Sequence, residues 1–127
     1  MTQNIMDAAR INLVSVSPTE ASATMPVEGN TQPFGVLHGG ATALLLETVG
    51  SYAAHAHAQL SGCVAVGTEL SVSHLRSVRK GTVHAFAQAQ HTGKSSAVYV
   101  ITVRDDTERI IATGRLTCRI LEAPAQS

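Results

Sequence analysis

The sequence is very poor in aromatic residues, with no tryptophan, two tyrosines and two phenylalanines in 127 residues. A chain of this length is expected to form one domain, residues 1–127, in which 119–127 form a partly loose C-terminal tail. Alanine, valine, leucine and isoleucine must fill its core, and each buries less area than an aromatic side chain. We therefore expect extra burial between subunits, which predicts an oligomer.

The sequence also has no excess of either charge and no long apolar run. Nine basic residues balance nine acidic ones, which argues against a general binder of nucleic acids or membrane surfaces. No run reaches the ~18 consecutive apolar residues that span a membrane, and no signal-peptide pattern is visible. The two cysteines, Cys63 and Cys118, lack CxxC spacing and indicate free thiols. We expect a cytoplasmic protein without nucleic-acid or membrane partners.

Charged residues are almost absent from one long segment. Between Glu28 and Glu69 the only acidic or basic residue is Glu47, which lies in an apolar, helix-like run. Burying an unpaired carboxylate is costly or forces its pKa upward. Glu47 is therefore either a partly exposed or interface-paired glutamate, or a group retained for function.

Basic residues, in contrast, stand without acidic neighbours between residues 70 and 103, where all four charged residues are positive. They could be ordinary solvated strand ends. They could also form a site for a small polyanion, such as a nucleotide-bearing cofactor. These four residues are Arg76, Arg79, Lys80 and Lys94.

The spacing of hydrophobic residues along the chain predicts the order of the helices and strands. Two short strands are expected at 11–17 and 21–26, and Gly39 to about His57 reads as one long helix, apolar on nearly all sides. After a turn at 61–62 the period changes to two, which predicts an antiparallel meander. The fold class is therefore α+β, with a central helix packed on a curved antiparallel sheet. The later strands are expected within 63–73, 82–90, 97–103 and 110–121.

The start of the long helix has the features of an anion site. Gly39 and Gly40 leave backbone N–H groups open at a helix N-terminus, where an oxygen gaining negative charge is stabilised. Ser51, one turn after Glu47, could hold a water beside it. His38 and Glu47 are separated by roughly 13 Å of helix and half a turn, so one site would need both from different subunits. His38 could equally be a loop or capping histidine.

Three segments resemble the hotdog-fold acyl-CoA thioesterases: QPFGVLHGGATALLLETVGS (32–51), VGTELSVSHLR (66–76) and HTGKSSAVYVITVRDD (91–106). The resemblance is closest to the branch that hydrolyses hydroxybenzoyl-CoA, phenylacetyl-CoA and 1,4-dihydroxy-2-naphthoyl-CoA. It implies a hotdog fold and a homodimer with shared active sites, often paired into a homotetramer. It also implies an acyl-CoA substrate and no cofactor beyond the coenzyme A of that substrate.

The resemblance assigns catalytic roles to five residues. Glu47 would be the nucleophile or the general base, and would act on a substrate held by the other subunit. The N–H of Gly39 would polarise the thioester carbonyl, with His38 and Gln32 orienting it. The Ser51 hydroxyl would position the water.

The resemblance also places contacts to coenzyme A, with Arg76 and Lys94 as the choices for its phosphates. Relatives often carry His-His-Arg-Pro where this chain has His-Leu-Arg-Ser at 74–77, so the rim of the site differs in shape. The implied substrate-binding and CoA-binding residues are Gly67, His74, Leu75, Arg76, Ser77, His91, Thr92, Gly93, Lys94, Ser95 and Ser96.

Three other functions compete with hydrolysis. Metal catalysis is disfavoured because His55 and His57, two apart on a helix, point in nearly opposite directions and no further ligand motif supports them; we expect no metal. A hotdog dehydratase or hydratase would also use a histidine and an acid at a subunit interface. A non-catalytic acyl-CoA-binding module would keep the fold and tolerate Glu47→Gln.

Overall fold

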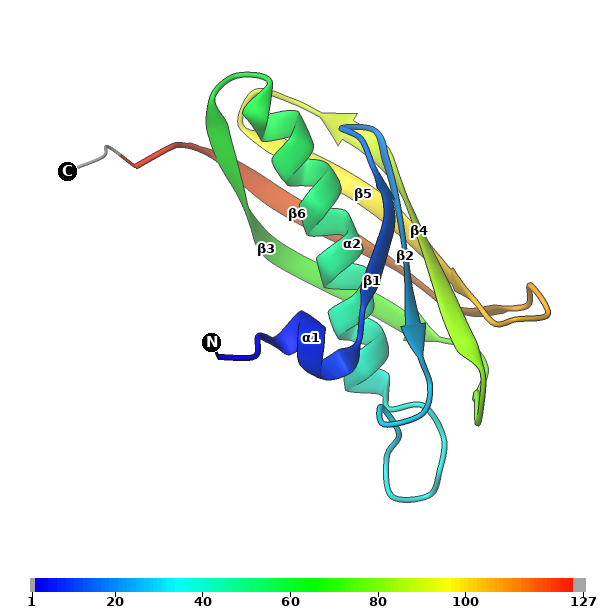
Figure 1. The fold of residues 1–127 in the computed structure, drawn as a ribbon. Helices are drawn as coiled ribbons and strands as arrows, with labels where there is room; N and C mark the ends of the chain where they lie inside the picture. The colour runs from blue at the N-terminus through cyan, green and yellow to red at the C-terminus, as the bar shows by residue number, and fades with distance from the viewer. Residues whose placement is uncertain (1, 125–127) are drawn as a thin grey trace.

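The structure, a computed structural model, describes residues 2–124. It consists of two helices and one six-stranded antiparallel sheet with the strand order β1-β2-β4-β5-β6-β3 (Figure 1). The elements are α1 (Ile5–Ala9), β1 (Asn12–Val16), β2 (Glu20–Pro26), α2 (Gly39–Gln59), β3 (Cys63–His74), β4 (Thr82–Thr92), β5 (Ser96–Arg104) and β6 (Ile110–Glu122).

The long helix α2 lies across the hollow side of the curved sheet (Figure 1) and contacts all six strands. Its inward side buries Leu45, Leu46, Val49 and Ala53 completely. This arrangement confirms the α+β class and the central helix that the apolar run predicted. Within residues 2–124, no helix has the length and apolar character needed to cross a membrane.

Small side chains fill the core, as the lack of aromatic residues predicted. On β4, for example, Val83, Ala85 and Ala87 are all buried on the side that faces α2. The largest fully buried side chain is Tyr99, whose hydroxyl donates a 2.6 Å hydrogen bond to the carbonyl of Pro18. Burial raises the pKa of Tyr99 to about 12, and the nearby Cys118 thiol adds to the effect. The hydroxyl therefore stays protonated and keeps its bond at ordinary pH.

The position of β3 differs from the expected meander. Of the four strands that follow α2, only β4, β5 and β6 are neighbours in sequence order, whereas β3 lies at the edge of the sheet beside β6. The chain between residues 74 and 82 crosses to the other half of the sheet, where β4 pairs with β2. One side of β3 therefore has no partner strand within the described chain.

The C-terminal tail begins later than expected. β6 continues to Glu122, which pairs with Cys63 at the start of β3. Residues 119–121, expected both at the end of the last strand and in the partly loose tail, are strand residues together with Glu122, and they pair with β3. Residues 125–127 lie outside the described part of the chain.

Candidate active site

The side chain of His38 caps the long helix. Its Nδ1 accepts a 2.8 Å hydrogen bond from the N–H of Gly40, and the residue before Gly39 has the extended backbone of an N-cap. An accepting Nδ1 places the proton of the neutral ring on Nε2. The capping role considered for His38 is therefore confirmed in this chain, and Gly40 is no longer available as a donor.

The N–H of Gly39, in contrast, is available as a donor. Within residues 2–124 no group accepts a hydrogen bond from it, and Gly39 lines a pocket of about 250 Å³. A Cβ added at Gly39 would lie 3.2 Å from Nε2 of His74, which is tighter than most Cβ contacts, so glycine lets the imidazole lie close without displacement. A free N–H at a helix N-terminus suits a developing oxyanion. The pocket is lined by Leu37, Gly39, Thr42, His74, Leu75, Arg76, Ser77 and Ile111.

Gln32 lies in the loop before α2, and its side chain is engaged within that loop. Its Oε1 accepts a hydrogen bond from the N–H of Phe34, and Gly35 completes the turn with a φ of 86°. Arg79 donates a 3.2 Å bond to the carbonyl of Phe34, whose own side chain is 83% exposed. The amide oxygen of Gln32 is therefore used within the turn, and Gln32 is not among the residues that line the Gly39 pocket.

The carboxylate of Glu47 lies against β3 at Gly67, where the absence of a side chain leaves room for it. The hydroxyl of Ser51 donates a 3.3 Å bond to its Oε2, and a Cβ on Gly67 of β3 would overlap the same oxygen. No basic side chain of residues 2–124 forms an ion pair with Glu47. Burial raises the pKa of Cys118 to about 11, and the charge of Glu47 contributes to this shift. The carboxylate is therefore half-buried, carries one hydrogen bond and has no cationic partner.

The expected site residues form three groups along α2. Gly39, with residues 74–77, lies at the start of the helix, and the Glu47 group lies roughly 12 Å further along. The 91–96 turn lies near the other end, where a ring nitrogen of His57 is 2.7 Å from the carbonyl of Gly93. Roughly 27 Å of helix separates residue 57 from residue 39. One chain therefore brings residues 74–77 to Gly39 but does not bring residues 91–96 to them.

Three pocket residues were not anticipated from the sequence. Thr42 follows Gly39 by three residues on one helix, so helical spacing could have identified it. Leu37 directly precedes the capping histidine. Ile111 reaches the pocket because the start of β6 pairs with the end of β3, and local periodicity carries no signal for such a pairing.

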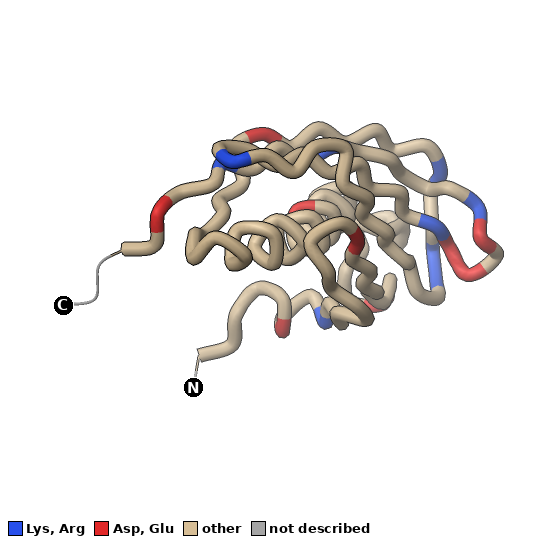
Figure 2. Tube along the Cα trace, turned by 90° about the horizontal axis from the view of Figure 1, so that it is seen from above, with Lys and Arg blue, Asp and Glu red and all other residues tan. Residues whose placement is uncertain are grey.

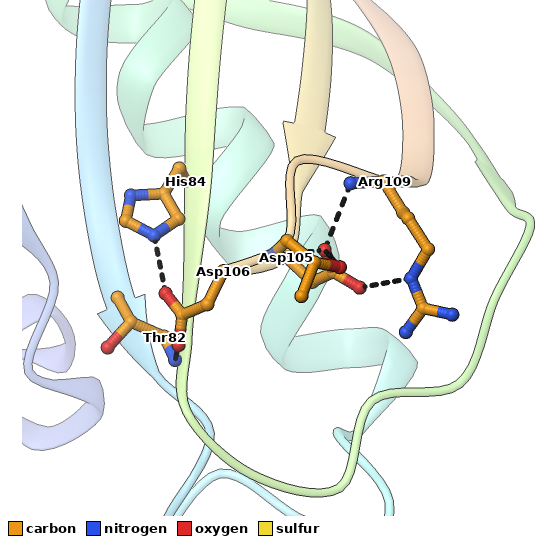
Figure 3. A network of polar contacts seen from close by, with 6 residues as sticks. Thr82, His84, Asp105, Asp106 and Arg109 are labelled. Carbon is orange, nitrogen blue, oxygen red and sulfur yellow. Dashed lines mark hydrogen bonds and ion pairs between the residues drawn. The ribbon is translucent and has the colours of Figure 1, made fainter.

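A polar network holds the turn between β5 and β6, next to the pocket end of the sheet (Figure 3). The carboxylate of Asp105 accepts hydrogen bonds from the backbone and side chains of Thr107 and Arg109, including a 2.9 Å bond from Arg109 Nε. Desolvation raises the pKa of Asp105, but these bonds more than offset it and hold the pKa at about 2. Asp106 bonds to His84 and to the N–H of Thr82, which lowers the pKa of Asp106.

We expect Asp105→Asn to remove a pH-dependent part of the protein's stability. The folded-state pKa is lower than the ordinary 3.8, so the unfolded chain takes up the proton first as the pH falls. The stabilisation is therefore present above about pH 4 and is lost between about pH 4 and pH 2. Urea unfolding of both proteins across this range should show their difference shrinking towards low pH. Glu20→Gln, at an exposed position that begins β2, is the control, and an unchanged difference would contradict the assignment.

Comparison with known proteins places this geometry in a family. The Thioesterase superfamily profile matches residues 34–112. The proofreading thioesterase EntH of Cronobacter sakazakii is 47% identical over 100 residues, which cover 78% of this chain and 72% of that protein. The 1,4-dihydroxy-2-naphthoyl-CoA hydrolase of Escherichia coli is 36% identical over 93% of this chain and 87% of that protein. A solved structure of a mutant of thioesterase PA1618 from Pseudomonas aeruginosa has a TM-score of 0.88 and 34% identity, covering 94% of this chain and 86% of that one.

A long helix in the hollow of a curved antiparallel sheet, shared with solved thioesterases, defines the hotdog fold. The chain belongs to the thioesterase superfamily and is a thioester hydrolase.

Proposed function

We propose that this protein hydrolyses an acyl-CoA with an aromatic or similarly bulky acyl group, with Glu47 as nucleophile or general base. The observation that carries the proposal is the half-buried carboxylate of Glu47, which has Ser51 as its hydrogen-bond partner and no ion-pair partner among the described residues. A carboxylate held by a salt bridge would be a weaker base and nucleophile. The leading substrates are 1,4-dihydroxy-2-naphthoyl-CoA, which the E. coli relative is named for, and hydroxybenzoyl-CoA.

The reaction would begin with the thioester carbonyl against the N–H of Gly39. As a general base, Glu47 would take a proton from a water held by Ser51, and that water would attack the carbonyl carbon. As a nucleophile, Glu47 would attack directly and form an anhydride, which water then cleaves. In both cases the Gly39 N–H stabilises the oxyanion, and the thiol of coenzyme A leaves. The wide separation of Gly39 and Glu47 in one chain favours a shared site.

The free edge of β3 supplies a way to build that shared site. Antiparallel pairing of β3 with its copy would place the Cys63 end of one strand beside the His74 end of the other. The 91–96 turn lies near the Cys63 end, because Ser95 accepts a bond from Ile120 and β6 pairs with β3 there. The turn of one subunit would then approach the Gly39 pocket of its partner. We propose this homodimer, a homotetramer of two such pairs, and a cytoplasmic location in keeping with the two free cysteines.

The test is thiol release from a panel of acyl-CoAs, with sedimentation analysis at the assay concentration. The panel contains benzoyl, hydroxybenzoyl, phenylacetyl, dihydroxynaphthoyl and medium-chain aliphatic thioesters. We expect the aromatic thioesters to have the highest kcat/KM and the active species to be a dimer or tetramer. Faster hydrolysis of the aliphatic thioesters would refute the proposed substrate class, and an active monomer would refute the shared site.

A further inference from the structure

One side chain links the 91–96 turn to the long helix. His57, in the last turn of α2, places its Nε2 2.7 Å from the carbonyl oxygen of Gly93. A carbonyl oxygen only accepts hydrogen bonds, so Nε2 carries a proton and is the donor. Within residues 2–124 no other side chain forms a hydrogen bond with this turn. His57 therefore joins α2 to a segment 36 residues later in the chain.

The hairpin that carries the turn is irregular next to it. The pairing of β4 with β5 shifts register at residues 89–91, which weakens the ladder locally. Beyond this shift, one backbone bond closes the turn on itself, and another, from the N–H of Ile120 to the carbonyl of Ser95 at 2.9 Å, attaches it to β6. Both bonds fix the turn relative to the sheet. The bond from His57 is the one that fixes it relative to the helix.

The position of the turn decides where one positive charge lies. Lys94 is the only Lys, Arg, Asp or Glu of residues 91–96, and it is exposed without an ion-pair partner in the described chain. Figure 2 shows more Lys and Arg at the end of the sheet far from the C-terminus than at the end near it, and the bond from Ile120 places the turn near the C-terminal end. Salt screens such a charge within about 8 Å. Its placement therefore decides which part of a bound substrate it reaches.

The helix that carries His57 also carries Glu47. Residues 47 and 57 lie roughly 15 Å apart along the axis of α2. In the proposed dimer, Glu47 and the 91–96 turn both come from the subunit opposite the Gly39 pocket, so the two serve the same site. The bond from His57 then makes the carboxylate and the turn parts of one rigid unit.

We propose that His57 is a positioning residue, whose bond to Gly93 holds the 91–96 turn on α2 so that Lys94 meets the substrate at a fixed distance from Glu47. The inference rests on the proposed function, because it assumes an acyl-CoA in the shared site. A turn without this bond must be ordered each time a substrate binds, and that entropy cost lowers the affinity. The carboxylate of Glu47 keeps its own contact with Ser51, so the chemical step is unaffected.

Calorimetric titration of the full-length protein with coenzyme A tests the proposal without turnover. His57→Leu removes the donor and should weaken binding about fivefold, the scale of an exposed charge contact. His57→Gln should restore the affinity to within about twofold, because its amide N–H lies as many bonds from Cα as Nε2 does. Tyr99→Phe is the matched control, since it removes another side-chain hydrogen bond to a turn carbonyl, that of Pro18. It should lower the urea midpoint and leave the affinity unchanged.

A double-mutant cycle shows whether His57 acts through Lys94. Lys94→Gln should weaken binding by a similar factor, and the double variant should bind like either single variant, because the turn then has no charge to place. On acyl-CoA thioesters the His57→Leu and Lys94→Gln variants should raise KM and keep kcat within about twofold. Effects that multiply in the double variant, or an affinity that Lys94→Gln leaves unchanged, would overturn the proposal.

Amide hydrogen exchange of residues 91–96 measures the position of the turn directly. Exchange should be faster in His57→Leu than in the wild type and should return to normal in His57→Gln. Unchanged exchange in His57→Leu would show that the bonds to the sheet hold the turn alone, and would also overturn the proposal. A wild type that binds coenzyme A but hydrolyses no thioester would refute the proposed function, and the binding cycle would still decide the role of His57.

Discussion

Glu47→Gln should lower kcat for thioester hydrolysis by ~10²-fold or more, the scale expected for an acid–base group or nucleophile. The amide has nearly the same shape as the carboxylate and can still accept the hydrogen bond from Ser51. It cannot take a proton from water or attack a carbonyl. The side chain has no ion pair to lose within the described chain, so the urea midpoint should change little. Steady-state kinetics and urea unfolding of one preparation test both expectations.

Glu20→Gln provides the matched control for this substitution. Glu20 begins β2, away from the proposed β3 interface, and its side chain is exposed. The same chemical change there should leave kcat and KM within about twofold, because surface substitutions away from a site have small effects. Full activity of Glu47→Gln would exclude Glu47 from the chemistry of hydrolysis and would contradict the proposed mechanism.

The sequence predicted the individual elements well because their signals are local. The uncharged run around Glu47 predicted α2, and the structure places its start at Gly39 as expected. The period of two correctly predicted β4, where the buried Val83, Ala85 and Ala87 alternate with exposed residues. The order of the strands was not predictable in the same way, because residues pairing across the sheet leave no periodic trace within one strand. The meander was therefore wrong for β3.

The same limit, that only local contacts leave a signal in the sequence, decides which parts of the candidate site could be predicted. Spacing along one helix indicated that Ser51 could lie beside Glu47, and the structure places them in contact. Spacing could not show that Gly67 lies under this carboxylate, because that contact depends on how β3 returns along α2. Nor could it show that Lys94 and Arg76 lie at opposite ends of the chain's long helix. The roles assigned to these residues by resemblance remain predictions.

Gly67→Ala should reduce kcat by ~10²-fold while leaving KM nearly unchanged. A Cβ at this position would overlap Oε2 of Glu47, so the carboxylate must move aside. A displacement of ~1 Å at a reacting group can cost ~10²-fold in rate. The backbone at Gly67 does not have the positive φ that only glycine adopts readily, so alanine should fit the strand itself. The overlapping atom ends a flexible side chain, and stability should therefore be retained.

The kinetic pattern of Gly67→Ala separates two roles for this glycine. If Gly67 only contacts the CoA portion, as the resemblance implies, the added methyl group would raise KM and leave kcat unchanged. Gly50→Ala is the control for crowding, because its Cβ would approach Cδ2 of Leu116 at 2.7 Å in the core rather than the carboxylate. That variant should lose stability and keep its kcat. A fall in kcat confined to Gly67→Ala would show that the missing side chain at Gly67 leaves the carboxylate of Glu47 the space it needs for the reaction.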